Sequence, residues 1–226
     1  MSVAVVLVAG GQGARLGAAQ PKAFVVLAGA PLLEHAVRHA LAAPEVSHVI
    51  VVAPASHLRE AGAIASRSSR PDDVDVVAGG AERTDSVAAG LAALRPDDGI
   101  VLVHDAARAL APASLFSRLV REVRSGHPAV VPGLPVTDTV KVVDARGRVT
   151  GTPDRSTLRA IQTPQAFLRE VLQHAHSSGE RATDDAALVE RIGGHVRVVD
   201  GDRMAFKITT PDDLATAERH LSDRDV

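Results

Sequence analysis

Short runs of consecutive apolar residues recur along the chain and alternate with stretches of different periodicity. The runs are rich in β-branched residues and end at glycine, proline or polar positions: VAVVLV (3–8), HVIVVA (48–53), DVVA (75–78), IVLVH (100–104) and AVVP (129–132). Continuous apolar runs of this length are typical of strands that are buried on both faces of a parallel sheet.

The stretches between these runs have the periodicity of amphipathic helices. Examples are PLLEHAVRHALA (31–42), RTDSVAAGLAAL (83–94) and ASLFSRLVREVR (113–124). Strands that alternate with helices predict an α/β fold, with a mostly parallel sheet and helices on both faces.

The alternation stops after Pro132, where extended segments follow one another without a helix between them. TVKVV (139–143), a turn at Gly147, RVTGTP (148–153) and LRAIQT (158–163) predict a β-arm over about 136–161. We then expect helices at 165–176 and 183–192, strands at 196–201 and 206–208, and a last helix from Pro211, with Thr210 as its N-cap. No linker divides the chain, so we predict a single domain over 1–226 that carries the arm.

Composition and charge exclude several classes of function. The 226 residues carry 25 basic and 27 acidic side chains, so nothing suggests a protein that wraps nucleic acid. The four aromatic residues are all Phe, and cysteine is absent, which excludes base-stacking platforms, disulfides and thiolate metal sites. The first apolar run is too short for a bilayer and has no basic residues before it. We therefore expect a soluble cytoplasmic protein with no membrane partner.

A glycine-rich loop follows the first predicted strand, at the end of the sheet where open α/β folds bind ligands. The loop reads AGGQGARLG over 9–17, and Lys22 follows soon after. It fails the dinucleotide fingerprint, because Leu16 stands where the third Gly or Ala is needed, and no GxxxxGK[ST] loop is present. The alternative to a phosphate loop is a tight strand-to-helix turn that binds nothing.

The lysines are the more specific signal. Only three of the 25 basic residues are Lys, namely Lys22, Lys141 and Lys207, and a compact ammonium suits a single phosphate oxygen. Lys22 lies beside the glycine loop and is a candidate phosphate ligand, whereas Lys141 is equally consistent with an ordinary strand lysine.

Two further segments contain candidate ligands. Asp105 follows the strand at 100–104, where a carboxylate can hold Mg²⁺, although it could instead cap the next turn or pair with Arg108. Gly79 and Gly80 open a second strand-to-helix turn, in which Ser86 could contact a base or ribose or serve as part of a helix N-cap. We interpret His104 as structural and assign His174 and His176, two residues apart on a helix, to solvent.

In order along the chain, the motifs resemble those of the 2-C-methyl-D-erythritol 4-phosphate cytidylyltransferase family. They are AGGQGARLG with Pro21-Lys22, GGAERTDS (79–86), VHDAAR (103–108), DTVK (138–141), Asp154-Arg155, TPQ (163–165), TDDA (183–186) and FKIT (206–209). The chain departs from the usual family pattern at Ala109, where proline is usual, and at Ala23, which precedes Phe24. The resemblance implies a Rossmann-like nucleotidyltransferase that joins CTP to the polyol phosphate, with Mg²⁺ as cofactor and pyrophosphate as the second product.

The same resemblance assigns roles to individual residues. It implies that Arg15, Lys22, Arg155 and Lys207 are catalytic and that Asp105 binds the metal. The nucleotide would be bound by Ala9, Gly10, Gly11, Gly13, Gly80, Ser86 and Ala106. The acceptor would be bound by Asp105, Arg108, Thr139, Arg155, Thr163, Thr183 and Lys207. It further implies a homodimer, in which the arm brings Arg155 to the other subunit's site.

Two other functions share these features. A ribitol-5-phosphate cytidylyltransferase would carry out the same chemistry on another polyol phosphate, and the two differ in an acceptor pocket that spacing does not resolve. A regulator that binds nucleotides without turnover would have no need of both Arg15 and Lys22 as transition-state cations.

Overall fold

The computed structural model of the chain describes residues 1–11, 13–17, 20–180 and 182–222. Its centre is an eight-stranded sheet in the order β10-β7-β11-β6-β1-β4-β5, with β12 paired to β7. These strands are β1 (Ser2–Val8), β4 (His48–Ala53), β5 (Val74–Ala78), β6 (Asp98–Asp105), β7 (Ala129–Pro135), β10 (Arg159–Ile161), β11 (Gln165–Leu168) and β12 (Arg197–Asp200). Of these eight strands, β10 and β11 run in the direction opposite to the other six, so the predicted mostly parallel sheet is confirmed.

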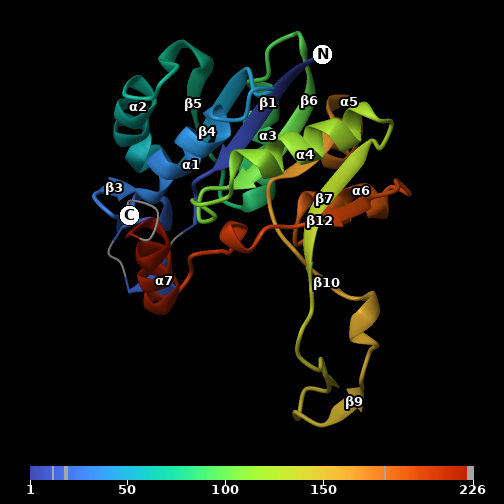
Figure 1. The fold of residues 1–226 in the computed structure, drawn as a ribbon. Coiled ribbons are helices and arrows are strands. Elements are labelled where there is room, and N and C mark those ends of the chain that lie inside the picture. The colour runs from blue at the N-terminus through green and yellow to red at the C-terminus, as the bar shows by residue number, and fades with distance from the viewer. Residues whose placement is uncertain (12, 18–19, 181, 223–226) are drawn as a thin grey trace.

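Helices cover both faces of this sheet, as predicted (Figure 1). One face packs against α1 (Leu32–Leu41), α2 (Leu58–Ser66) and α4 (Ala113–Arg124), and the other packs against α3 (Arg83–Ala92), α5 (Arg169–Ser177) and α6 (Asp185–Arg191). The residues of β1 alternate between the two cores, with Val5 in the first and Val6 in the second. None of the helices in the described ranges has the length and apolar character needed to cross a membrane.

The connections place a crevice at the carboxyl ends of β1 and β6. From β1 the chain moves through β4 to β5 with α1 and α2 on one face, then returns along α3 on the other face to β6, on the opposite side of β1. Val8 and Asp105, the last residues of β1 and β6, are paired in register. Open α/β sheets bind their ligands at such a reversal of strand order.

The C-terminal segment packs beside this crevice through a third apolar cluster. Helix α7 (Pro211–Ser222) contributes Ala217, which is buried with Leu27, Leu110 and Ile208. The expected cap is present, because the Thr210 hydroxyl accepts a hydrogen bond from Asp213 N at 3.2 Å and Asp213 accepts from Thr210 N at 2.8 Å. This packing holds Lys207, next to Ile208, at the edge of the crevice.

Residues 136–158, here called the arm, leave the sheet between β7 and β10 and project away from the body of the subunit (Figure 1). The arm contains a small hairpin of β8 (Val142–Val143) and β9 (Val149–Gly151), with Gly147 at φ +76° in its turn. Val142, Val143 and Val149 are each more than half exposed within the single chain. Two-stranded hairpins are marginal on their own, and these apolar side chains are left uncovered within the described chain.

The remaining elements are short. They are the hairpin of β2 (Val26–Leu27) and β3 (Ala30–Pro31), and 3₁₀ turns at Ala14–Leu16, Lys22–Phe24, Ala55–His57, Pro71–Asp73, Arg155–Thr157 and Arg203–Ala205.

Three sequence predictions need correction. Residues 165–168, expected to begin a helix, form β11, which is inserted antiparallel between β6 and β7. The strand expected at 206–208 is absent from the described structure there, because Ile208 N makes a single backbone hydrogen bond, to Ala107 O, and its side chain enters the third cluster. Residues 159–161, grouped with the arm, pair with β7 in the main sheet.

Candidate active site

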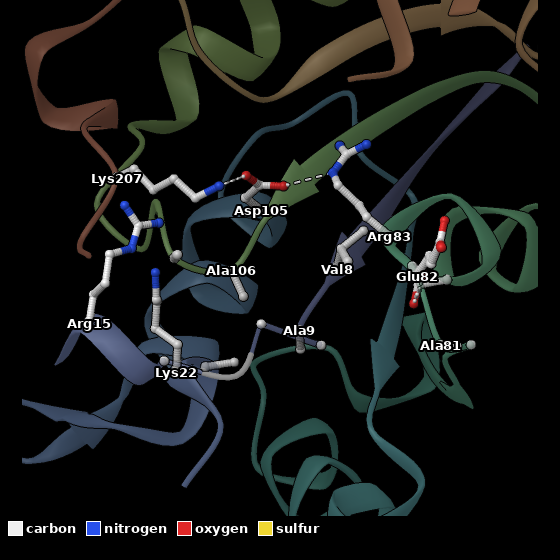
Figure 2. A pocket seen from close by; sticks show the side chains of 17 residues that line it. Val8, Ala9, Arg15, Lys22, Ala81, Glu82, Arg83, Asp105, Ala106 and Lys207 are labelled. Atoms are coloured by element: carbon white, nitrogen blue, oxygen red, sulfur yellow. Dashed lines mark hydrogen bonds and ion pairs between the residues drawn. The ribbon is translucent and has the colours of Figure 1, made fainter. Parts of the chain in front are cut away.

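A cavity of about 440 Å³ occupies the crevice at the carboxyl ends of β1 and β6. Its walls come from the glycine-rich loop after β1, the turn between β5 and α3, the end of β6, and Lys207 from the C-terminal segment (Figure 2). Segments that are far apart in the sequence thus surround one space, at the place that the strand pattern predicted.

The glycine-rich loop folds back onto the segment that carries Lys22. Lys22 N donates to Gly11 O at 2.9 Å, and Leu16 N donates to Gly13 O at 2.8 Å. Gly13 has φ +70°, and a Cβ there would lie 3.2 Å from Lys22 N, so a side chain would be strained and crowded. The loop conformation therefore places Lys22 at the wall of the cavity.

Three cations gather on this side of the cavity. Figure 2 shows the side chains of Arg15, Lys22 and Lys207 pointing toward a common region. Lys22 is buried, and its pKa is lowered first by burial and then by the positive charges of Lys207 and Arg15. Like charges held close together raise the energy of the free protein, and such an arrangement is expected of a site that binds a polyanion.

Asp105 lies between these cations and a fourth one. Its Oδ2 accepts a hydrogen bond from Lys207 Nζ at 2.8 Å, and its Oδ1 lies 3.5 Å from Arg83 Nε (Figure 2). Burial alone would raise the pKa of this carboxyl, but Arg83 and Lys207 together lower it to about 2. Asp105 is therefore ionised at neutral pH, and its side chain pairs with Arg83 and Lys207 rather than with Arg108.

The second glycine turn packs tightly against the start of α3. A Cβ on Gly79 would lie 2.8 Å from Ser86 Oγ, and one on Gly80 would lie 2.3 Å from Asp85 Cβ, so neither position has room for a side chain. Ser86 Oγ donates to Glu82 O at 3.1 Å and also lines the cavity. Ser86 thus stabilises the first turn of the helix and faces the space where a ligand would bind.

Arg83 is a cavity residue to which the sequence analysis gave no role. Its guanidinium contacts Asp105 on the cavity side, and its Nη2 lies 2.7 Å from Asp185 Oδ2 in the interior. Arg83 lies in the motif GGAERTDS and Asp185 lies in TDDA, and both motifs carry the family resemblance. Their presence in these motifs was the sequence signal that pointed to a role in the site. Spacing could not reveal the contact, because 102 residues separate the two.

The structure brings most of the predicted site residues together. Those that line the cavity are Arg15, Lys22, Asp105 and Lys207 together with the predicted nucleotide-binding residues Ala9, Gly10, Gly11, Gly13, Gly80, Ser86 and Ala106. Gln12, within the loop motif, lies outside the described residues.

Two predicted residues that do not line the cavity brace it. Asp105 N donates to Thr163 Oγ1 at 3.0 Å, and Thr163 in turn bonds His104 Nδ1 at 2.9 Å. Arg108 Nη1 donates to Ala205 O at 2.7 Å and so ties the C-terminal segment to the end of β6. Both side chains fix backbone that carries cavity residues.

The remaining three predicted residues lie away from the cavity. Thr183 is exposed just before α6, while Thr139 and Arg155 are exposed on the arm. The Arg155 guanidinium donates to Thr137 O, within the arm itself.

The two histidine interpretations have different outcomes. His104 is structural as expected: burial lowers its pKa to about 3, so the ring is neutral, and its Nδ1 lies 2.9 Å from the Thr163 hydroxyl oxygen. The assignment of His176 to solvent is wrong, because its side chain is only 5% exposed and its Nε2 lies 3.0 Å from Asp185 Oδ1. His174, two residues earlier, is exposed as expected.

The donor set favours phosphate over a bare metal ion. Over the described ranges, no three His, Asp or Glu side chains are grouped so that they could hold a metal. A magnesium ion that arrives with substrate phosphates needs only one or two protein carboxylates, and the Asp105 oxygens at the cavity wall fit that requirement. Loop amides, ammonium groups and guanidinium groups around one space are suited to bind polyphosphate and to stabilise charge that develops on it.

Comparison with known proteins gives consistent results. A model of the 2-C-methyl-D-erythritol 4-phosphate cytidylyltransferase family matches residues 3–223. A curated protein of that name from Nocardia farcinica is 55% identical over 223 residues, covering 99% of this chain and 95% of the relative. One from Saccharopolyspora erythraea is 52% identical, covering 98% of this chain and all of the relative.

Solved structures agree in fold. The 4-diphosphocytidyl-2C-methyl-D-erythritol synthase of Anaerococcus prevotii superposes with a TM-score of 0.85 at 28% identity and covers 98% of both chains. The 2-C-methyl-D-erythritol 4-phosphate cytidylyltransferase of Thermus thermophilus has a TM-score of 0.78 at 33% identity, covering 98% of this chain and all of that one.

Proposed function

The chain belongs to the 2-C-methyl-D-erythritol 4-phosphate cytidylyltransferase family, and from this premise we propose how its cavity joins CTP to 2-C-methyl-D-erythritol 4-phosphate. The protein is a nucleotidyltransferase of isoprenoid precursor synthesis. The observation that carries the proposal is the group of Arg15, Lys22 and Lys207 around a glycine-lined cavity. These cations lie where two anionic substrates would have to meet.

Charge decides the mechanism. The acceptor's phosphate monoester is already anionic near neutral pH, so one of its oxygens can attack the α-phosphorus of CTP without a general base. A bond forms between that oxygen and the α-phosphorus, the bond to the β-phosphate oxygen breaks, and pyrophosphate leaves with its electron pair. Negative charge grows on the non-bridging and departing oxygens. Arg15 and Lys22, fixed beside the glycine loop, would stabilise that charge.

The two sides of the cavity would hold different substrates. The loop glycines, Gly80 and Ser86 would bind CTP, because these residues line the cavity together with Lys22. Asp105 and Lys207 would bind the acceptor, since the carboxylate can accept from polyol hydroxyls and the ammonium can contact the phosphate. Thr163 and Arg108 would act by holding the backbone of this side in place.

Mg²⁺ is the cofactor that we infer. It would be held by Asp105 together with phosphate oxygens of CTP, and it would neutralise part of the triphosphate charge when bound. Lys207 contacts one Asp105 oxygen and Arg83 contacts the other, and each oxygen keeps a further lone pair for a metal.

A second copy of the chain would complete the acceptor side. Arg155 and Thr139 are exposed on the arm, and the arm also presents Val142, Val143 and Val149 to solvent. We propose a homodimer in which these apolar residues are covered and Arg155 reaches the partner's cavity to hold the acceptor phosphate. We place this enzyme in the cytoplasm.

A parallel assay of substrates tests the proposed function. Pyrophosphate release would be measured with CTP and methylerythritol phosphate, with CTP and ribitol 5-phosphate, and with ATP in place of CTP. We expect turnover in the first mixture only. Release with ribitol phosphate at a similar rate, or no release in any mixture, would contradict the assignment.

A further inference from the structure

A row of four polar contacts runs from the interior behind α3 into the cavity. His176 Nε2 on α5 lies 3.0 Å from Asp185 Oδ1, and Asp185 Oδ2 lies 2.7 Å from Arg83 Nη2. Arg83 Nε lies 3.5 Å from Asp105 Oδ1, and Asp105 Oδ2 accepts from Lys207 Nζ at 2.8 Å. The last three residues line the cavity, whereas His176 and Asp185 lie outside it.

The inner end of this row is buried. The Asp185 side chain is 1% exposed and that of His176 is 5% exposed. Burial alone would raise the pKa of the Asp185 carboxyl, but the hydrogen bond from His176 and the charge of Arg83 keep that pKa below its usual value. A buried carboxylate that stays ionised must keep its partners, because an unpaired buried charge is strongly destabilising.

Arg83 is therefore shared between two carboxylates. Asp185 holds one edge of its guanidinium in the interior, and Asp105 contacts the other side at the longer distance of 3.5 Å. Without the Asp185 carboxylate, Arg83 would interact more strongly with Asp105. It would then compete with Lys207 for the Asp105 carboxylate.

We propose that Asp185 and His176 are positioning residues of this active site, acting through Arg83 to set how Asp105 and Lys207 face the acceptor. The inference rests on the proposed function, which places the acceptor at Asp105 and Lys207. His176 donates from Nε2, and its Nδ1 has no hydrogen-bond partner within the described part of the chain. The ring contributes one donor to the row, and that donor holds the Asp185 carboxylate toward Arg83.

Steady-state kinetics of matched variants test this role. His176→Leu removes the donor, His176→Gln keeps an amide donor near the same place, and His174→Leu alters an exposed histidine of the same helix. We expect His176→Leu to raise KM for methylerythritol phosphate on the order of 10-fold, as loss of an outer-shell partner does at metal sites. KM for CTP should change less than about twofold, within the range of surface substitutions. His176→Gln should recover most of the effect, and His174→Leu should show none.

A double-mutant comparison tests whether His176 acts through Asp185. Once Asp185→Asn has weakened the attachment of Arg83, adding His176→Leu should change KM for the acceptor no further, because both act through one contact. Equal and independent effects would show that His176 acts elsewhere. If His176→Leu fails to fold, Asp185→Asn alone must produce the acceptor-specific change in KM. Failure of both to fold would assign the pair a structural role and overturn the proposal.

The outcomes separate this inference from the proposed function. A wild-type protein that releases no pyrophosphate from CTP and methylerythritol phosphate refutes the proposed function. An active wild type, together with a His176→Leu variant that has a lower melting temperature but unchanged kinetic constants, refutes only the positioning role.

Discussion

Lys22 is held in a position that disfavours the charged form of its side chain in the free protein. It is 8% exposed, and burial, Lys207 and Arg15 all lower its pKa. A side chain that served only the fold would gain from being apolar there. At the scale of single residues, this makes Lys22 the clearest sign that the cavity is built for phosphate chemistry.

We expect Lys22→Met to lower kcat by about 10²–10³, the usual cost of losing one preorganised charge donor. The variant should be at least as stable as the wild type, because methionine keeps the buried stem and removes the repulsion from Arg15 and Lys207. Turnover and thermal unfolding measured on the same samples check both parts. Arg67→Met, at an exposed cation on α2's C-terminal end, is the control and should change neither. Normal turnover of Lys22→Met would contradict a catalytic role for Lys22 and would show that the loop only binds the substrate.

The pKa of Lys22 also predicts how nucleotide affinity depends on pH. In the free protein this pKa lies below 10.5, and a bound triphosphate would raise it again by favouring the charged form. CTP therefore binds the protonated form best, and its affinity should fall as pH rises through the free-protein pKa. Titration calorimetry across alkaline pH would measure this. An affinity that stays flat up to pH 10.5 in the wild type, or falls equally in Lys22→Met, would contradict the prediction.

At the scale of elements, β6 carries a carboxylate at each end. Asp105 ends the strand at the cavity, and Asp98 begins it at the opposite edge of the sheet. Asp98 is buried and accepts from His48 Nδ1, Arg95 N and Ser2 Oγ, while His48 Nε2 contacts the half-exposed Asp75. This second cluster joins β4, β5 and β6 and takes no part in the cavity.

We expect Asp98→Ala to lower the free energy of unfolding by about 3–5 kcal/mol, the usual cost of removing one partner of a buried pair. Asp75→Ala is the matched control on the same histidine, and because Asp75 is 54% exposed it should cost less than about 1 kcal/mol. Urea unfolding would give both values. Kinetic constants of the folded Asp98→Ala protein should match the wild type, and a selective loss of acceptor affinity would show that the two ends of β6 are coupled.

The elements that the sequence predicts well are those whose signal is local. The five β-branched runs all occur as strands, and ASLFSRLVREVR forms α4 over the expected residues. The prediction that a helix begins with the QAFL segment at 165–168 is wrong. A short apolar run fits either a helix or a strand until its partners are known. Its partners are β6 and β7, and sequence spacing does not reveal a strand inserted between them.

The candidate site divides in the same way. The glycine loop and Asp105 could be found because each directly follows a predicted strand, and Lys22 could be found because it is a rare lysine soon after that loop. Arg83 and His176 could not be placed, since their roles depend on Asp185, which meets them only after α3, α5 and α6 have packed together. A histidine judged by its helical spacing alone gives no sign of a partner nine residues later.

At the scale of the whole molecule, the arm is the feature that a single subunit leaves incomplete. Its apolar side chains are exposed and Arg155 contacts only arm backbone, at Thr137 O, among the contacts that the described chain makes. In the proposed homodimer, the partner would cover the apolar side chains of the arm, and Arg155 would contact the substrate.

Subunit mixing tests whether Arg155 acts in the partner's cavity. Arg155→Ala and Lys22→Ala proteins should each be nearly inactive, but a mixed dimer would contain one site with both defects and one intact site. An equimolar mixture should therefore regain about one quarter of wild-type activity once subunits have exchanged at random. If mass measurements confirm exchange and the mixture stays inactive, Arg155 does not act in trans.

The path of the phosphorus atoms tests the central claim most directly. CTP labelled at the α-phosphate, incubated with methylerythritol phosphate and Mg²⁺, should pass its label entirely into a diphosphocytidyl product, while the β- and γ-phosphates leave together as pyrophosphate. Label that accumulates in CMP, or that stays in CTP under conditions where the protein is folded, would contradict transfer to the acceptor in this cavity.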